Sequence, residues 1–199
     1  TNNILNNRVG TLSTGTGNPV GANGGQQNIG ILINGSTGNT LNANVIGNAK
    51  SHGVSLVSAN TNTLTANLIG LDINGTGKIP NNGDGVNLLS SNSNNIGGVN
   101  AANGNFISAN KLNGVTIAGT SGLATTGNLV QNNYIGTNKN GVGSTFGNEG
   151  LGIALSYANT TQILANVVSK NTLGGISLSN SGTNAGTFNT INSNIIGFD

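Results

Sequence analysis

The segment NTLTANLIG, residues 62–70, has a pattern that returns along the whole chain. In each copy the third and eighth positions are aliphatic and the sixth is asparagine. The other copies are NNILNNRVG at 2–10, NTLNANVIG at 39–47, NFISANKLN at 105–113, NLVQNNYIG at 128–136, TQILANVVS at 161–169 and NTINSNIIG at 189–197. Self-similarity at a period of a few tens of residues is the signature of a solenoid. The seven copies therefore predict about seven stacked coils.

Each copy of this nine-residue motif is predicted to form two short strands around a bend. A helix would place its third and eighth positions on different faces, and its glycine and asparagine content disfavours a helix. We expect the sixth-position asparagine to adopt the left-handed conformation at the bend and to bond through its amide to its equivalents one coil above and below. The predicted ladder contains Asn7, Asn44, Asn67, Asn110, Asn133, Asn166 and Asn194.

A second motif, glycine followed by aliphatic, any residue and aliphatic, predicts a third strand in each coil. Its alternation has the period of two that strands require. The copies begin at Gly30, Gly53, Gly85, Gly114, Gly152 and Gly175. Three strands per coil, each paired in parallel with its copy about 4.8 Å away, make an all-β, single-stranded parallel β-helix. We interpret residues 1–199 as one such domain with uncapped ends, a repeat unit or segment of a longer solenoid or fibre.

The connections between the motifs show a longer period of two coils. Long loops follow the nine-residue motifs that begin at 2, 62 and 128, whereas the others lead into short connections. These loops share a glycine pair that predicts a common turn: Gly15 and Gly17, Gly75 and Gly77, Gly141 and Gly143. Since the loops leave their coils at one corner, we expect them to form a ridge down one side of the solenoid.

The alternation of the two motifs and the long loops at 69–86 and 135–153 resemble the right-handed parallel β-helix repeats of large bacterial secreted and cell-surface proteins. These repeats belong to the pectate-lyase-like superfamily. The resemblance covers nearly the whole chain and implies a right-handed coil and an extracellular or cell-surface setting. The superfamily contains enzymes, adhesins and structural proteins, so the fold alone does not select a function.

The composition excludes several classes of function. Only 5% of the residues are charged, and six basic residues are too few for a nucleic-acid surface. No apolar stretch approaches the roughly 20 residues of a membrane span, and the lack of cysteine excludes disulfides and thiolate metal sites. The lysines are interpreted as scattered, solubilising charges, with Arg8 at the motif position of Lys111: Lys50, Lys78, Lys111, Lys139 and Lys170.

The few acidic residues do not predict a catalytic or metal site. Lyases and glycosidases on this fold use clusters of aspartate beside the sugar ring. Asp72 and Asp84 share one loop, but Asn138 lies opposite Asp72 in the next long loop, and no acid lies opposite Asp84. We interpret both as solvated loop carboxylates, with a weak calcium site at the pair as the alternative. No catalytic, cofactor-binding or metal residue is assigned.

The single histidine, His52, is interpreted as an exposed turn residue. A general base needs an orienting carboxylate, and none is found nearby in sequence or at the equivalent position of adjacent coils. A stacked aromatic platform for sugars is not expected either, because the aromatic residues fall at unlike motif positions: Phe106, Tyr134, Phe146, Tyr157, Phe188 and Phe198. Glycosylation acceptor patterns at Asn34, Asn74 and Asn159 are attributed to chance in so asparagine-rich a chain.

The first hypothesis for function is a non-enzymatic extracellular structural protein. Motif copies stand at both ends with no cap between them and solvent, and an uncapped coil exposes unpaired backbone groups. We therefore expect head-to-tail stacking with copies of itself, as a fibre subunit, or a role as a surface stalk or adhesin segment. The alternative is a carbohydrate-active, pectate-lyase-like enzyme or polysaccharide-binding module, whose partner is a polysaccharide.

Overall fold

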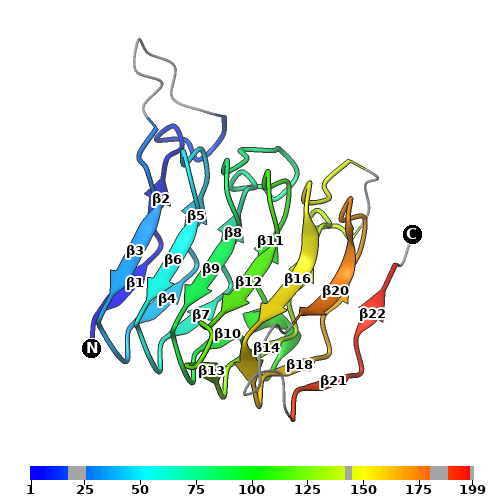
Figure 1. Ribbon diagram of the computed structural model, residues 1–199. Helices are drawn as coiled ribbons and strands as arrows, with labels where there is room; N and C mark the ends of the chain where they lie inside the picture. Colours follow the sequence, from blue (N-terminus) through cyan, green and yellow to red (C-terminus); the bar gives the residue numbers. More distant parts are fainter. Residues whose placement is uncertain (18–25, 142–144, 180–187, 198–199) are drawn as a thin grey trace.

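The computed structural model is a right-handed parallel β-helix and describes residues 1–17, 26–141, 145–179 and 188–197. Three parallel sheets run the length of the stack, here called sheets A, B and C (Figure 1). Within the described residues, sheets A and B have seven strands each and sheet C has six. The predicted fold class and the number of coils are confirmed.

Each of the first six coils contributes one strand to each sheet, and the described residues of the last coil contribute strands to sheets A and B. Sheet A contains β1 (Asn3–Leu5), β4 (Thr40–Asn42), β7 (Thr63–Thr65), β10 (Asn95–Gly97), β14 (Leu129–Gln131), β18 (Gln162–Leu164) and β21 (Thr190–Asn192). Sheet B contains β2 (Arg8–Val9), β5 (Val45–Ile46), β8 (Leu68–Ile69), β11 (Phe106–Ile107), β15 (Tyr134–Ile135), β19 (Val167–Val168) and β22 (Ile195–Ile196). Sheet C contains β3 (Ile31–Asn34), β6 (Val54–Val57), β9 (Val86–Leu89), β12 (Val115–Ala118), β16 (Leu151–Ser156) and β20 (Gly174–Ser179).

The core is one coil wide and is filled by rows of aliphatic side chains in register. In sheet A, Leu64 pairs with Ile96 and Ile96 with Val130, and all three are fully buried. Burying a side chain of this size stabilises the fold by about 1.5–3 kcal/mol. The inward positions of sheet C form similar rows, as the second motif predicts.

Buried asparagine amides connect the coils between sheets A and B. Asn67 donates from Nδ2 to Oδ1 of Asn105 at 2.9 Å, and Asn105 donates in the same way to Asn133 at 2.9 Å. The predicted ladder is confirmed at six of its seven positions, and Asn105 stands where Asn110 was predicted; its members are Asn7, Asn44, Asn67, Asn105, Asn133, Asn166 and Asn194. Two further ladders run beside it, one of Asn39, Asn62, Asn94 and Asn128, the other of Asn81, Asn110, Asn148 and Asn171.

The register predicted for residues 105–113 is wrong. Ile107, expected in sheet A, pairs with Ile69 and Ile135 in sheet B. Asn110, expected in the ladder between sheets A and B, belongs to the ladder after sheet B instead.

The cause of this shift is an insertion inside the motif. The sheet A strand of this coil is β10, and residues 98–104, with the short 3-10 helix η1 (Ala101–Asn103), separate it from β11. The apolar residue expected at the eighth position, Leu112, is 51% exposed. The segment 105–113 therefore begins with the second half of the split true copy, and its resemblance to a whole motif is due to chance.

The left-handed conformation predicted for the sixth-position asparagine is also wrong. The residue before it has the positive φ, as in Ala66 with φ 53°. The same conformation occurs at Asn6, Ala43, Asn132, Ala165 and Ser193. The bend is thus made one position earlier, and this leaves the asparagine amide directed into the ladder.

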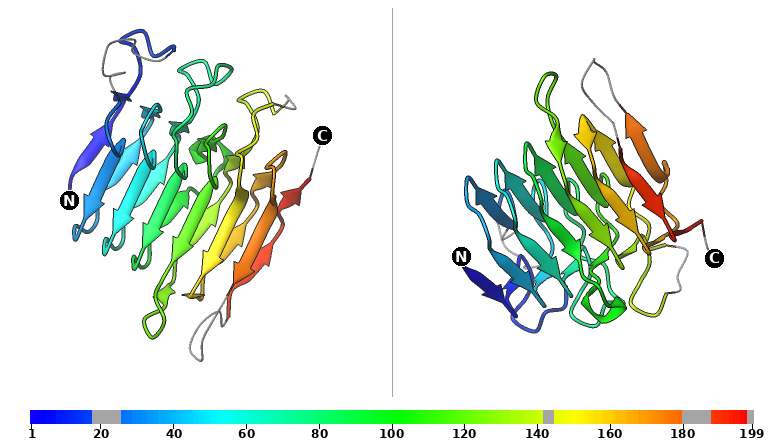
Figure 2. Two further views of the ribbon diagram at one scale, coloured as in Figure 1. Left: turned by 45° about the horizontal axis from the view of Figure 1, so that its top comes forward. Right: turned by 90° about the horizontal axis from the view of Figure 1, so that it is seen from below.

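The long loops stack on one another along one side of the coils, as the sequence predicts (Figure 2). The N–H of Ile73 donates to the carbonyl of Gly15, and that of Lys139 donates to the carbonyl of Gly75, both at 2.9 Å. The common turn is confirmed at its first glycine, whose N–H donates to the carbonyl three residues earlier in each loop: Gly15 to Leu12, Gly75 to Asp72 and Gly141 to Asn138. Gly143 lies outside the described residues.

Candidate functional site

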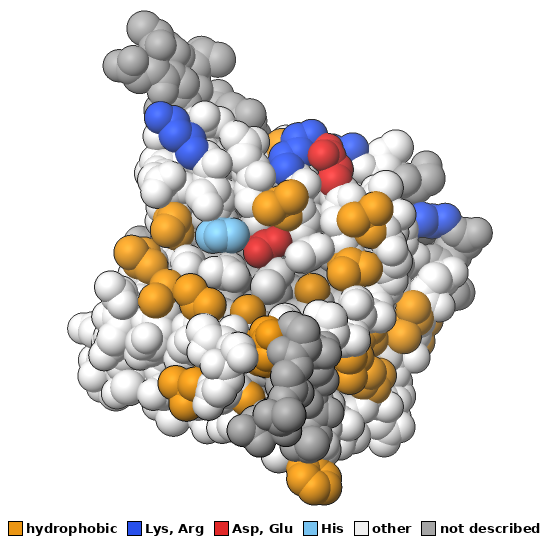
Figure 3. Space-filling view, in the orientation of Figure 1, with side chains coloured by type: hydrophobic (Ala, Val, Ile, Leu, Met, Phe, Trp, Pro, Cys, Tyr) orange, Lys and Arg blue, Asp and Glu red, His pale blue; other side chains and the backbone are white. Residues whose placement is uncertain are grey.

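His52 and Asp84 lie side by side in consecutive coils at the start of sheet C. Nδ1 of His52 is 3.5 Å from Oδ2 of Asp84, and the backbone N–H of Asp84 donates to the same nitrogen at 3.1 Å. The imidazole is 24% exposed and the carboxyl side chain 7% exposed. Figure 3 shows the histidine beside an acidic side chain on this face of the molecule. The pair therefore has a buried acid behind a solvent-accessible ring.

The environment of Asp84 opposes its charge. Burial raises the pKa of the Asp84 carboxyl above its usual range. The backbone N–H of Asn113, 2.9 Å from Oδ1, the charge of His52 and the hydroxyl of Thr116 act in the opposite direction and offset part of this rise in the pKa. The protonation of Asp84 thus depends on the charge of His52.

A glycine lets the backbone pass close to the imidazole. The N–H of Gly83 donates to the carbonyl of Ser51 at 2.7 Å. A Cβ at Gly83 would lie 2.9 Å from Nδ1 of His52 and 2.8 Å from the carbonyl carbon of Ser51. A side chain there would displace the imidazole, so the position of the ring depends on this glycine.

The surface next to the pair is lined by hydroxyl and amide groups. Asn87 and Thr116 occupy equivalent, half-buried positions in β9 and β12, between the inward-facing aliphatic residues, whereas Ser55 at the same position of β6 is buried. Nδ2 of Asn113 donates to Oγ1 of Thr116 at 3.0 Å. Such groups are suited to saccharide hydroxyls, which both donate and accept hydrogen bonds.

Two proton positions on His52 give the pair acid–base capacity. With the proton on Nε2, Nδ1 accepts from the Asp84 N–H. With the proton on Nδ1, the bond from the Asp84 N–H is lost and the ring N–H faces the Asp84 carboxylate instead. Nε2 is then free to take a second proton from a substrate, and the carboxylate stabilises the imidazolium. The arrangement fits proton transfer by a general base.

Two interpretations made from the sequence are therefore wrong. His52 has the carboxylate partner that was expected to be missing, and Asp72 and Asp84 are buried, with 7% and 5% exposed, rather than solvated. Oδ1 of Asp72 accepts the N–H groups of Thr76 and Gly77 at 3.0 and 2.9 Å and so shapes its own turn. A calcium site at Asp72 and Asp84 stays a prediction; in the ranges that the structure describes, no group of three or more metal-binding His, Asp or Glu side chains occurs.

The expectation that the aromatic residues do not stack is wrong. The cause is again the incorrect register predicted for residues 105–113. Phe106 and Tyr134 pair in β11 and β15, with ring centroids 4.7 Å apart and planes 9° apart. Arg8, expected at the motif position of Lys111, stands in the sheet B row of Phe106. Phe198 lies outside the described residues.

The signal that would have found the pair was present in the sequence. His52 and Asp84 both stand directly before the glycine of the second motif, in copies 32 residues apart. Aligning the chain on that motif, and not on the shared long loop, brings the two side chains into register. The alignment by loops concealed them because Asp84 belongs to the end of its loop.

No family model and no curated protein matches the sequence. Among solved structures, the periplasmic alginate epimerase AlgG matches with a TM-score of 0.66 and 16% identity, over 97% of this chain and 39% of that one. The A-module of the mannuronan C-5 epimerase AlgE6 of Azotobacter vinelandii matches with a TM-score of 0.54 and 18% identity, over 86% of this chain and 51% of that one. The chain thus spans about two fifths to one half of these proteins and shares their fold, the right-handed parallel β-helix.

The prediction that the chain is not an enzyme is corrected by this finding, because the proteins that share its fold are epimerases. The carbohydrate-active alternative is better supported than the structural fibre. No helix in the described part of the chain is long and apolar enough to cross a membrane.

Proposed function

We propose that this chain is a carbohydrate-active β-helix module that binds an acidic polysaccharide along the outer face of sheet C and transfers a proton on it through His52. The observation that carries the proposal is the pair formed by the accessible imidazole of His52 and the buried carboxyl of Asp84. The likeness in fold to epimerases of alginate and mannuronan supports the substrate class. The periplasmic location of one of them supports a site of action outside the cytoplasm.

The chemistry follows from what a change of configuration at a sugar carbon requires. The base takes the proton from the carbon, the bonding electron pair moves into the adjacent carboxylate, whose charge a cation neutralises, and a proton from water returns to the carbon. His52 is the base, since its imidazole is open to solvent and has the Asp84 carboxyl beside it. Asp84 orients the ring and stabilises its charged form. Lys50, two residues before His52 on the same coil, supplies a positive charge at this edge.

The test is proton exchange on defined polymers. The purified chain is incubated in deuterated water with polymannuronate, alginate and polygalacturonate, and NMR follows deuterium incorporation at the sugar carbons. We expect exchange on at least one polymer, with His52→Gln lowering its rate by about 10²–10⁴-fold. Asp84→Asn should lower it less, because the ring keeps its position but loses the stabilising charge.

Lys139→Gln serves as the matched control, because Lys139 lies in a long loop whose backbone bonds to Gly75 and not in the row of His52 and Asp84. Unchanged exchange in a folded His52→Gln variant would sink the proposal. The absence of exchange on all three polymers would rule out the proposed substrate class.

A further inference from the structure

Three lysines that are far apart in the sequence meet around one cavity. Lys78 belongs to a long loop, Lys111 to the connection before β12, and Lys170 to the connection after β19. The cavity has a volume of about 230 Å³, and its polar lining is completed by Glu149, Thr145 and Thr172. The interpretation of these lysines as scattered solubilising charges does not describe this arrangement.

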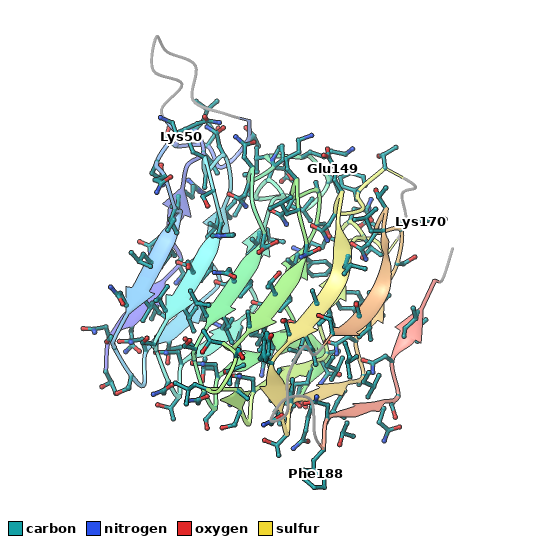
Figure 4. All side chains as sticks on the ribbon, viewed as in Figure 1. Lys50, Glu149, Lys170 and Phe188 are labelled. Carbon is teal, nitrogen blue, oxygen red and sulfur yellow. The ribbon has the colours of Figure 1, made fainter. Side chains whose placement is uncertain are left out.

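Contacts with neighbouring side chains orient two of these ammonium groups. Nζ of Lys78 lies 5.5 Å from the centroid of the Phe146 ring, within the range of a cation–π interaction. Nζ of Lys111 forms an ion pair with Glu149 across consecutive coils. Lys170 lines the same cavity from the next coil, and Figure 4 shows Glu149 and Lys170 at the same end of the coils.

The cavity concentrates the positive charge of a weakly charged molecule. Three ammonium groups and one carboxylate leave two positive charges there, in a chain whose net charge is +2. The threonine side chains add hydroxyl donors. Ammonium and hydroxyl donors around a small cavity match an oxyanion, with charge-assisted hydrogen bonds as the attraction.

We propose that this cavity is an oxyanion-binding subsite that takes a carboxylate or sulfate group of an acidic saccharide. The inference rests on the proposed function for the polymer that carries the group. Its position supports this assignment, since Lys111 precedes by two residues Asn113, whose N–H binds Asp84. In the free protein Glu149 forms an ion pair with Lys111, so its carboxylate competes with the ligand for this ammonium group.

Isothermal titration calorimetry with sodium sulfate and with a short oligouronate tests the site without any activity assay. We expect Lys78→Gln, Lys111→Gln and Lys170→Gln each to weaken binding of both ligands by about three-fold to ten-fold, and the triple variant to abolish it. Glu149→Gln should strengthen binding, because it removes a competing carboxylate. Added sodium chloride should weaken binding through screening.

Lys139→Gln is the matched control, a lysine of a long loop that does not line this cavity. Binding that the triple variant keeps, or that Lys139→Gln loses equally, overturns the site. Sulfate binding without oligouronate binding overturns the saccharide as its source. Lysine-dependent oligouronate binding together with full exchange activity in His52→Gln would sink the proposed reaction and leave this subsite standing.

Discussion

At the bends, asparagine side chains join neighbouring coils by hydrogen bonds, as backbone pairing does along the strands. Asn67 is fully buried, accepts from the backbone N–H and the amide of Asn44, and donates to Asn105. A buried amide without these partners would cost about 1–3 kcal/mol per unsatisfied group. The chain therefore needs asparagine at this position in every coil, and this need explains the composition.

Asp84 gives the stability a predictable dependence on pH. Its pKa is raised in the folded state, so the folded protein holds the proton more tightly than the unfolded chain. This contribution to the free energy of unfolding is fully present below the usual carboxyl pKa and is lost as the pH rises through the raised value. We expect Asp84→Asn to remove that loss, because the amide carries no charge while its oxygen can still accept from Asn113.

Urea unfolding between pH 3 and pH 7 measures this effect. The free energy of unfolding of Asp84→Asn should change less with pH over the acidic window than that of the unmutated chain. Asp72→Asn is the comparison, since Asp72 accepts backbone N–H groups of its own turn. Identical pH profiles for Asp84→Asn and the unmutated chain would contradict the raised pKa.

The split coil shows how an element keeps its register despite an insertion. Residues 98–104 leave the stack between β10 and β11, and both strands still pair with their neighbours on each side. The ladder continues through Asn105, the first residue after the insertion. The strands and the amide fix the coil, and the chain between them can vary.

We expect Asn105→Ala to lower the free energy of unfolding by about 2–4 kcal/mol. The change removes the acceptor for Asn67 and the donor for the carbonyl of Leu64, both of which are buried. The exposed Asn100, in the insertion, is the control, and Asn100→Ala should change stability by less than about 0.5 kcal/mol. Urea denaturation of both variants checks the result, and equal effects would argue against the register described here.

At the scale of the whole molecule, stability should vary along the stack. Each coil contacts only its neighbours, so the inner coils are covered on both sides. Ile69 in β8 is fully buried, whereas Ile195 and Ile196 in β22 are each 52% exposed. We expect amide hydrogen exchange in β21 and β22 to be at least about a hundred-fold faster than in β8 and β11.

Amide hydrogen exchange also tests head-to-tail stacking with other copies of the chain, which stays a prediction. Stacking would slow exchange in β22 and in β1 as the protein concentration rises, since both strands would become covered. Exchange that is independent of concentration would contradict stacking. Uniform protection of all strands in a dilute sample would contradict the graded stability.

The sequence by itself determined the features that repeat in every coil. Three strands, the amide ladder, the glycine turn of the long loops and the thin aliphatic core all follow from local patterns, because each coil offers the same environment to the same motif position. Copies of NTLTANLIG and of the glycine motif were therefore sufficient to predict the fold. The chance likeness at 105–113 misled only where an insertion had split the true copy.

The tertiary structure alone decided which side chains of different coils meet. Neighbours such as Phe106 and Tyr134, or the three lysines around the cavity, are separated by stretches whose lengths differ from coil to coil. The number of residues in each loop determines which side chains come into contact. No local sequence pattern predicts these contacts. The candidate site depends on both, because the glycine motif places His52 and Asp84 at one position of consecutive coils, and the fold brings the base within 3.5 Å of its orienting acid.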